Sequence, residues 1–208
     1  MQCATMRHSL QAEGFGIRLR PVRMEDAAFI VWLRNLEHVR GRVGDTAASA
    51  ESQQAWLEKY FTREGDYYFV AETMSGIPVG THGIYDLANG SAEKGRQAVR
   101  PEVMAGVATA ILATDIAFGA LGLKEVRSNT VSTNANVISL HRKSGFKQVG
   151  LLQNHQIIDG NPVDLVQFLL LPEDWAKARE RQLPLAKIAG DQILAWEKMQ
   201  IGQRQPWE

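Results

Sequence analysis

The feature that most constrains this fold is a run of alternating strand and helix patterns between Glu93 and Phe146. A strand that leads into a helix through small residues directs backbone N–H groups and the positive end of the helix dipole at one point. The run therefore predicts a phosphate site, with His141 placed beside it by the second strand and helix. In order, the predicted elements are a strand at Glu93–Arg100, a turn at Pro101–Gly106, a helix at Val107–Gly122, a strand at Val126–Thr133 and a helix at Asn134–Phe146.

The composition is that of an ordinary globular protein. The chain has 208 residues, of which 45% are hydrophobic and 22% charged, so it can form one domain with a full core. Its formal net charge is zero, which gives no reason to expect nucleic acid or an anionic membrane as a partner. The single cysteine, Cys3, allows no disulfide framework and indicates a reducing compartment. No membrane span or secretory signal is visible, and we expect a cytoplasmic protein.

The N-terminal half predicts a strand, two helices and a meander. Residues 1–14 are expected to form a tail. Ile17 and Leu19 then alternate with arginines, which predicts a strand at Gly16–Val22. Helices are predicted from Glu25 to about Asn35 and from Ser49 to about Gly65, followed by antiparallel strands at Tyr67–Thr73, Pro78–Leu87 and Glu93–Arg100.

The C-terminal part predicts a hairpin and helices. Strands at Lys147–Ile158 and Pro162–Leu171 are joined at Asp159–Gly160, and a short helix follows at Pro172–Arg181. The last segment is amphipathic but is weakened by Gly190. We expect a tail at residues 1–14, one domain at 15–182 and a C-terminal helical extension at 183–208.

The order of elements and one motif resemble the GNAT superfamily of N-acetyltransferases. The motif is N-x-x-[AS]-x-x-x-[YH]-x-K-x-G-F, for which the chain supplies Asn134, His141, Lys143, Gly145 and Phe146, with Val137 at the small-residue place. The resemblance implies an α/β (α+β) fold with a mixed, mostly antiparallel central sheet flanked by helices. The sequences LRNLEHVR, AWLEKYF and AEKGR are similar to the branch that holds ribosomal-protein N-terminal acetyltransferases and acetyltransferases of nucleotide-linked amino sugars.

The chain departs from the family pattern at two places. The phosphate loop of the family reads [QR]-x-x-G-x-[GA], and this chain has Val103, or Pro101 in the other register, where Gln or Arg is expected. Tyrosine is the commoner residue at the place of His141.

The resemblance implies acetyl-CoA as cosubstrate and no metal. Small residues around Gly106 would let backbone N–H groups approach the pyrophosphate, although an ordinary strand-to-helix connection would show the same residues. The strand before this turn would pair with the pantetheine arm as an added strand does. The predicted CoA-binding residues are Ala98, Val99, Arg100, Met104, Ala105, Gly106, Val107, Ala108, Asn134, Asn136, His141 and Lys143.

The expected chemistry is direct attack of an amine on the thioester. By resemblance, His141 is the acid that serves the sulfur, because a histidine titrates near neutrality; the alternative is a polar helix residue. Glu93 and His82 are candidate bases, and Glu93 would serve equally as a surface ion-pair partner. A strand N–H near Val99 would hold the oxyanion.

The acceptor is expected beside the first helix. Arg34 and Arg40 would suit a phosphate or carboxylate, although solvated charges at a helix end explain them too. Asn35, Gln53 and Tyr85 complete the predicted acceptor residues. The favoured acceptor is a small-molecule amine such as a nucleotide-linked amino sugar. A protein N-terminus, a CoA-binding or assembly module without catalysis, and a homodimer remain open.

Overall fold

The computed structural model describes residues 7–42, 47–158 and 160–208. Cys3 and the Asp159 half of the predicted Asp159–Gly160 turn lie outside these ranges. The described strands form one eight-stranded sheet in the order β1-β2-β3-β4-β5-β6-β8-β7, and the β5–β6 pair alone is parallel within it. The strands are β1 (Ala12–Gly14), β2 (Ile17–Pro21), β3 (Tyr67–Thr73), β4 (Pro78–Ala88), β5 (Ser91–Val99), β6 (Glu125–Val131), β7 (Lys147–Ile158) and β8 (Asn161–Leu170).

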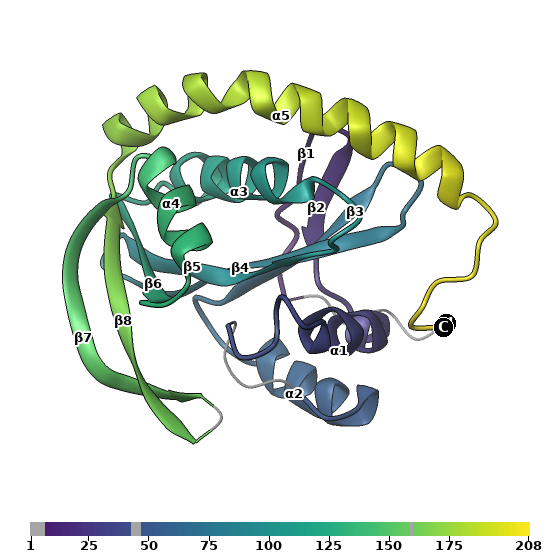
Figure 1. The fold of residues 1–208 in the computed structure, drawn as a ribbon, viewed down its shortest axis with the longest axis horizontal. Coiled ribbons are helices and arrows are strands. Elements are labelled where there is room, and N and C mark those ends of the chain that lie inside the picture. The colour runs from purple at the N-terminus through teal and green to yellow at the C-terminus, as the bar shows by residue number, and fades with distance from the viewer. Residues whose placement is uncertain (1–6, 43–46, 159) are drawn as a thin grey trace.

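Helices cover both faces of the sheet. Figure 1 shows α3, α4 and α5 on one face and α1 and α2 on the other, with β7 and β8 curving away at one side. The predicted mixed, mostly antiparallel sheet flanked by helices is confirmed. The helices are α1 (Ala27–Asn35), preceded by a 3₁₀ turn at Met24–Asp26, α2 (Ala50–Phe61), α3 (Ala105–Asp115), continued by a π turn at Ile116–Ala120, α4 (Ala135–Lys143) and α5 (Pro172–Gln200).

Each face of the sheet buries its own apolar cluster. Phe69 and Ile84 pack with α3 and α5, whereas Tyr68 and Val70, from the alternate positions of the same strand β3, pack with α1 and α2. This period of two is the strand pattern that the sequence shows at Tyr67–Thr73. Each fully buried large apolar side chain contributes about 1.5–3 kcal/mol to folding.

Two local predictions are wrong. Ala12–Gly14, within the predicted tail, forms β1 and pairs with β2. The chain from Pro172 to Gln200 is one helix rather than a short helix followed by a separate segment, so the predicted boundary at residue 183 falls inside α5. Gly190 does not end this helix: a Cβ there would lie 3.0 Å from the backbone of Phe15, so the glycine allows α5 to approach the β1–β2 turn.

Capping residues mark the start of α2 and both ends of α4. The Ser49 side chain accepts from the Ser52 N–H at the start of α2, and Asn134 Oδ1 accepts from the Val137 N–H at the start of α4. Gly145 follows α4 with φ of 87°, a conformation that favours glycine. These caps fix where α4 begins and ends against the sheet.

The fold opens a wedge between β5 and β6. The two strands share only the pairs Ser91↔Glu125, Ala92↔Val126 and Glu93↔Arg127. Beyond Glu93, β5 continues along β4 and β6 continues along β8, so the two strands part. A bulge lies just past this point: between the pairs Thr81↔Ala98 and Gly83↔Gly95 stand one residue of β4 and two of β5, and one of these two, Arg96, has φ of 52°.

Candidate functional site

A cavity of about 770 Å³ occupies the wedge between β5 and β6. Residues Glu93–Val99 of β5 line one side, and residues 128–131 of β6 line the other. The start of α3 contributes Gly106, α4 contributes several side chains, and the loop after α1 and the strand β7 line the remaining part. The cavity therefore runs between the two faces of the sheet, with α3 and α4 on one side and α1 and α2 on the other.

Lys94 is a buried cation at the base of the wedge. Its side chain lies on the α3 side of β5, and only 4% of the residue is exposed. Its Nζ donates a hydrogen bond of 2.7 Å to Thr114 Oγ1 and lies 5.4 Å from the centre of the Phe146 ring. Burial lowers the pKa of Lys94 to about 7, and nearby Asp115 opposes the shift. The ammonium is therefore easily deprotonated at physiological pH.

His141 is held as a neutral ring. It packs against Phe146 and Phe168, with ring centres 4.8 Å and 5.0 Å away, and its Nε2 lies 2.9 Å from Ser128 Oγ. Burial and then the charge of Lys94 lower the pKa of His141 to about 3. Both effects disfavour the imidazolium form, which differs from the expectation that this ring titrates near neutrality.

His82 also lines the cavity and is fully buried. Neither of its ring nitrogens has a hydrogen-bond partner among the described residues. Burial, followed by the charges of Lys94 and His141, lowers its pKa well below the usual value. These ring nitrogens could form hydrogen bonds with water or with a polar group of a ligand that enters the cavity.

Glu93 lies on the opposite side of the sheet from Lys94, where β5 and β6 make their last pair. Its Oε1 accepts from Tyr85 Oη and its Oε2 from Asn129 Nδ2, both over 2.9 Å. The carboxylate thus has a fixed direction and lines the cavity. This is the geometry required of a positioned proton acceptor.

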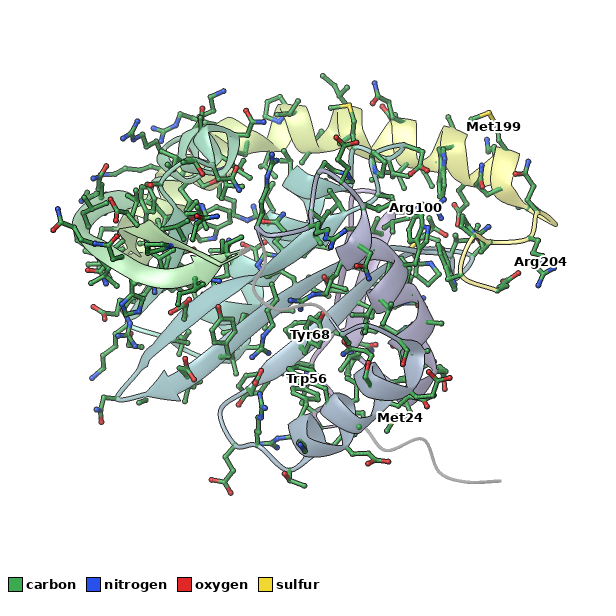
Figure 2. All side chains as sticks on the ribbon, turned by 60° about the horizontal axis from the view of Figure 1, so that its bottom comes forward. Met24, Trp56, Tyr68, Arg100, Met199 and Arg204 are labelled. Atoms are coloured by element: carbon green, nitrogen blue, oxygen red, sulfur yellow. The ribbon has the colours of Figure 1, made fainter. Side chains whose placement is uncertain are left out.

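Arg96 forms the wall on the α2 side. Its guanidinium makes two hydrogen bonds to Asp66, of 2.6 Å and 3.0 Å, and lies 4.2 Å from the centre of the Tyr85 ring. Trp56 and Tyr68, which lie close together in Figure 2, also contact this guanidinium. Because its charge is already paired, Arg96 acts as a rigid wall that supports Tyr85.

The cavity brings together part of the predicted site. The predicted residues that line it are Glu93, His82, His141, Ala98, Val99, Gly106, Asn134, Asn136 and Tyr85. All three candidate catalytic residues are among them. The residues that were missed include Lys94, Arg96, Gln97, Ser128, Asn129 and His155. A signal for Lys94 was present in the sequence, since it lies two residues after Ala92 and so points to the same, buried face of the strand.

Several predicted CoA-binding residues lie elsewhere. The side chains of Ala105 and Ala108 are buried in the core, Val107 packs against the core, and Met104 and Lys143 are exposed, so none of these five side chains lines the cavity. Arg100 is also outside it: its backbone N–H donates to the Val79 carbonyl, and Nη1 donates to Gln205 Oε1 over 2.8 Å. Figure 2 shows Arg100 beside the C-terminal segment that carries Arg204. The Arg100 guanidinium lies against the rings of Trp32, Trp196 and Trp207. These tryptophans therefore pack within the same chain.

Of the five predicted acceptor residues, Tyr85 lines the cavity and the other four do not. Arg34, Asn35, Arg40 and Gln53 do not line the cavity. The same LRNLEHVR segment and its continuation supply His38, Val39 and Arg42 instead. His38 Nε2 donates to the Val99 carbonyl over 3.0 Å. The segment thus reaches the cavity through residues in the turns after α1, and its contact with an acceptor stays a prediction.

Metal and membrane features give no further site. No group of three or more His, Cys, Asp or Glu side chains within the described ranges is placed to hold a metal ion. No helix in the described part of the chain is long and apolar enough to cross a membrane.

Comparisons with known proteins agree with this architecture. No curated protein sequence matches the chain. Among solved structures, a GCN5-related N-acetyltransferase from Brucella melitensis is 19% identical with a TM-score of 0.73 over 86% of each chain. Spermidine N-acetyltransferase from Vibrio cholerae, in complex with CoA and spermine, is 20% identical with a TM-score of 0.71 over 78% of this chain and 99% of its own. FdhC, a nucleotide-linked sugar GNAT, is 22% identical with a TM-score of 0.69 over 86% of this chain and 98% of its own.

These likenesses establish the fold, and a family model establishes the family. The model of the acetyltransferase (GNAT) domain matches residues 17–147, which is more than half of the chain and includes β5, α3, β6 and α4. With the wedge between β5 and β6, the predicted GNAT-like fold is confirmed. The chain belongs to the GNAT family of acetyltransferases.

Proposed function

We propose that this protein transfers an acetyl group from acetyl-CoA to a primary amine of a small molecule, and that the thioester lies between β5 and β6. The observation that carries the proposal is the cavity in the wedge. It has a strand edge on each side and reaches both faces of the sheet. A donor can therefore enter from the α3 side while an acceptor enters from the α2 side.

The α3 side suits the cosubstrate. Met104 at the start of α3 provides no side-chain cap, and the Ala105 N–H donates to the Val103 carbonyl. The N–H groups of Gly106 and Val107 then remain for a phosphate, as at other helix starts. Gln97 Nε2 donates to the Gly106 carbonyl over 2.8 Å and ties this turn to β5. The backbone of Ala98 and Val99, together with Asn134 and Asn136, lines the path from this turn to the wedge. Backbone N–H donors would hold the pyrophosphate without the family's Gln or Arg.

Glu93 is the proposed proton acceptor. An amine that attacks the thioester carbonyl becomes a cation and must lose a proton as the amide forms. Glu93 faces the acceptor side, and the bonds from Tyr85 and Asn129 fix its orientation. The bulge at Arg96 and Gln97 changes the direction of backbone groups of β5 near Glu93. An N–H group there would be suited to bind the oxyanion. No covalent enzyme intermediate is required.

An anionic acceptor fits the open end of the cavity. His38 and Arg42 from the loop after α1 and His155 from β7 line that end. A nucleotide-linked amino sugar would place its diphosphate against the Arg42 guanidinium, between the two histidine rings, and its amine toward Glu93. The likeness in fold to FdhC agrees with this class of acceptor.

The test is CoA thiol release with wild-type protein, acetyl-CoA and a panel of amines. The panel holds nucleotide-linked amino sugars, polyamines and peptides with free N-termini. We expect turnover with the amino sugars. Turnover confined to peptides would favour N-terminal acetylation of a protein. Turnover confined to polyamines would contradict the proposal that the acceptor is anionic. Binding of acetyl-CoA without turnover of any amine would favour a module without catalysis.

A further inference from the structure

We propose that Lys94 is a catalytic residue that gives a proton to the CoA sulfur as the thioester breaks. This role rests on the proposed transfer from acetyl-CoA. Lys94 follows Glu93, the last residue of β5 that pairs with β6, and its side chain points to the opposite face from Glu93. It therefore lies where the wedge begins, on the side of α3 and α4.

The contacts of Lys94 leave it able to act on a group in the cavity. Its Nζ donates to Thr114 Oγ1, and Thr114 Oγ1 in turn donates to the Ala110 carbonyl over 2.7 Å. The threonine proton is thus used elsewhere, and its oxygen must accept from Lys94. An ammonium has three N–H donors, so two remain for other acceptors. Since Lys94 lines the cavity, a sulfur that enters the wedge on this side is such an acceptor.

The surrounding charges single out Lys94 as the proton carrier. His82 on β4 and His141 on α4 face it, and both have lowered pKa values that leave them neutral. Asp115 on α3 attracts the ammonium but is itself bonded to Arg179 and Trp175. Burial lowers the pKa of Lys94 to about 7, so the ammonium is present at neutral pH yet gives up its proton easily.

The proton balance then closes across the sheet. The acceptor nitrogen attacks the thioester carbonyl carbon, and the N–C bond forms. The C–S bond breaks with its electron pair on sulfur, which takes a proton from the Lys94 ammonium and leaves as the thiol. The proton lost by the acceptor nitrogen goes to Glu93. After the products leave, Lys94 regains a proton and Glu93 loses one to water in the open cavity, so the transfer needs no other reactant.

His141 becomes a positioning residue in this scheme. Its ring is held by Ser128 and two phenylalanines and stays neutral, so it adds no second positive charge beside Lys94. This differs from the sequence-based expectation, in which His141 itself served the sulfur.

The test compares Lys94→Met, Lys94→Arg and the control Lys187→Met, an exposed lysine of α5. Methionine has a side chain of similar length but no ionisable group. Arginine keeps the positive charge but does not release a proton near neutrality. We expect both Lys94 variants to bind acetyl-CoA by calorimetry but to lose about 10²-fold in kcat, the lower end of the range for positioned acid catalysis. The control should match wild type.

The pH profile supplies a second measurement. Wild-type kcat should fall as the pH rises through the pKa of Lys94, which ¹³C NMR of the lysine Cε measures directly, and this limb should be absent from both Lys94 variants. A folded Lys94→Met protein with wild-type kcat and pH profile would overturn the role of Lys94 and leave the proposed function standing. A wild-type protein that neither binds acetyl-CoA nor releases thiol would overturn the proposed function and this role with it.

Discussion

Tyr85 Oη and Glu93 Oε1 form a 2.9 Å hydrogen bond across the adjacent strands β4 and β5. The two residues are direct cross-strand partners, so the bond is set by the register of the sheet rather than by a loop. Gly95 makes room for it, because a Cβ at that position would lie 2.5 Å from Tyr85 Oη. The strand spacing, the tyrosine and the glycine together fix the carboxylate at the wedge.

Replacing Tyr85 with Phe should weaken acetyl transfer. The substitution removes one of two donors to Glu93, and a hydrogen bond to a charged group is worth about 1.5–3 kcal/mol. We expect kcat/KM for the acceptor to fall at least about tenfold, while acetyl-CoA binding measured by calorimetry stays unchanged. Tyr67→Phe on β3 is the matched control. An unchanged kcat/KM would show that Tyr85 does not position the base.

Gly106→Glu should weaken acetyl-CoA binding. The nearest atom to a Cβ at Gly106 is Val99 Cγ2 at 3.9 Å, so a side chain fits without strain and its charge is what opposes a phosphate. We expect at least a tenfold rise in the Kd measured by calorimetry, and little change for Gly106→Ala. Gly119→Glu, at a position with open space, is the control. Equal affinities for wild type and Gly106→Glu would place the phosphate site elsewhere.

Charge reversal at Arg42 should raise the KM of an anionic acceptor. Arg42 lines the open end of the cavity, whereas Arg40, two residues earlier, is exposed and outside the lining. We expect Arg42→Glu to raise the acceptor KM and to leave the acetyl-CoA KM nearly unchanged. Arg40→Glu should behave as wild type in the same steady-state assay. The opposite ranking of the two variants would restore the prediction made from the sequence.

The buried histidines should make the protein sensitive to acid. His141 has a pKa of about 3 in the folded protein against an ordinary value of 6.5, so between these pH values the unfolded chain binds a proton that the native state refuses. Stability therefore falls as the pH drops from 6.5 toward 3, by about 1.4 kcal/mol per pH unit for this group. His8 and His82 act in the same direction.

The free energy of unfolding measured with denaturant between pH 7 and pH 4 checks this slope. His141→Phe cannot be protonated, so its stability should depend less steeply on pH than that of wild type. Parallel slopes for the two proteins would mean that His141 is protonated in the native state.

Local sequence signals predicted elements and caps well because their causes are local. Asn134 caps α4 through its own side chain, and Gly145 ends it through its own φ. The strand Tyr67–Thr73 has the predicted bounds. Its apolar side chains alternate between two faces of the sheet that are both buried, and this pattern is visible in the sequence. The sequence indicates Gly190 only as a residue that weakens the last segment, whereas in the structure it allows the close approach of Phe15.

The site was predicted only as far as the family motif and strand order reach. His82, Glu93 and His141 converge on one cavity, as expected from their elements. Arg100 was misplaced because its partners Trp196, Gln205 and Trp207 lie far away in sequence. The neutral state of His141 and the lowered pKa of Lys94 come from desolvation in the packed sheet, which no sequence pattern expresses.

The most direct test of the central claim is a crystal structure of the protein grown with acetyl-CoA. We predict density for the thioester between β5 and β6, with the pyrophosphate at the start of α3 near Gly106 and the sulfur on the Lys94 side of the sheet. Acetyl-CoA bound outside this wedge, with the cavity between Glu93 and Ser128 filled only by water, would contradict the account.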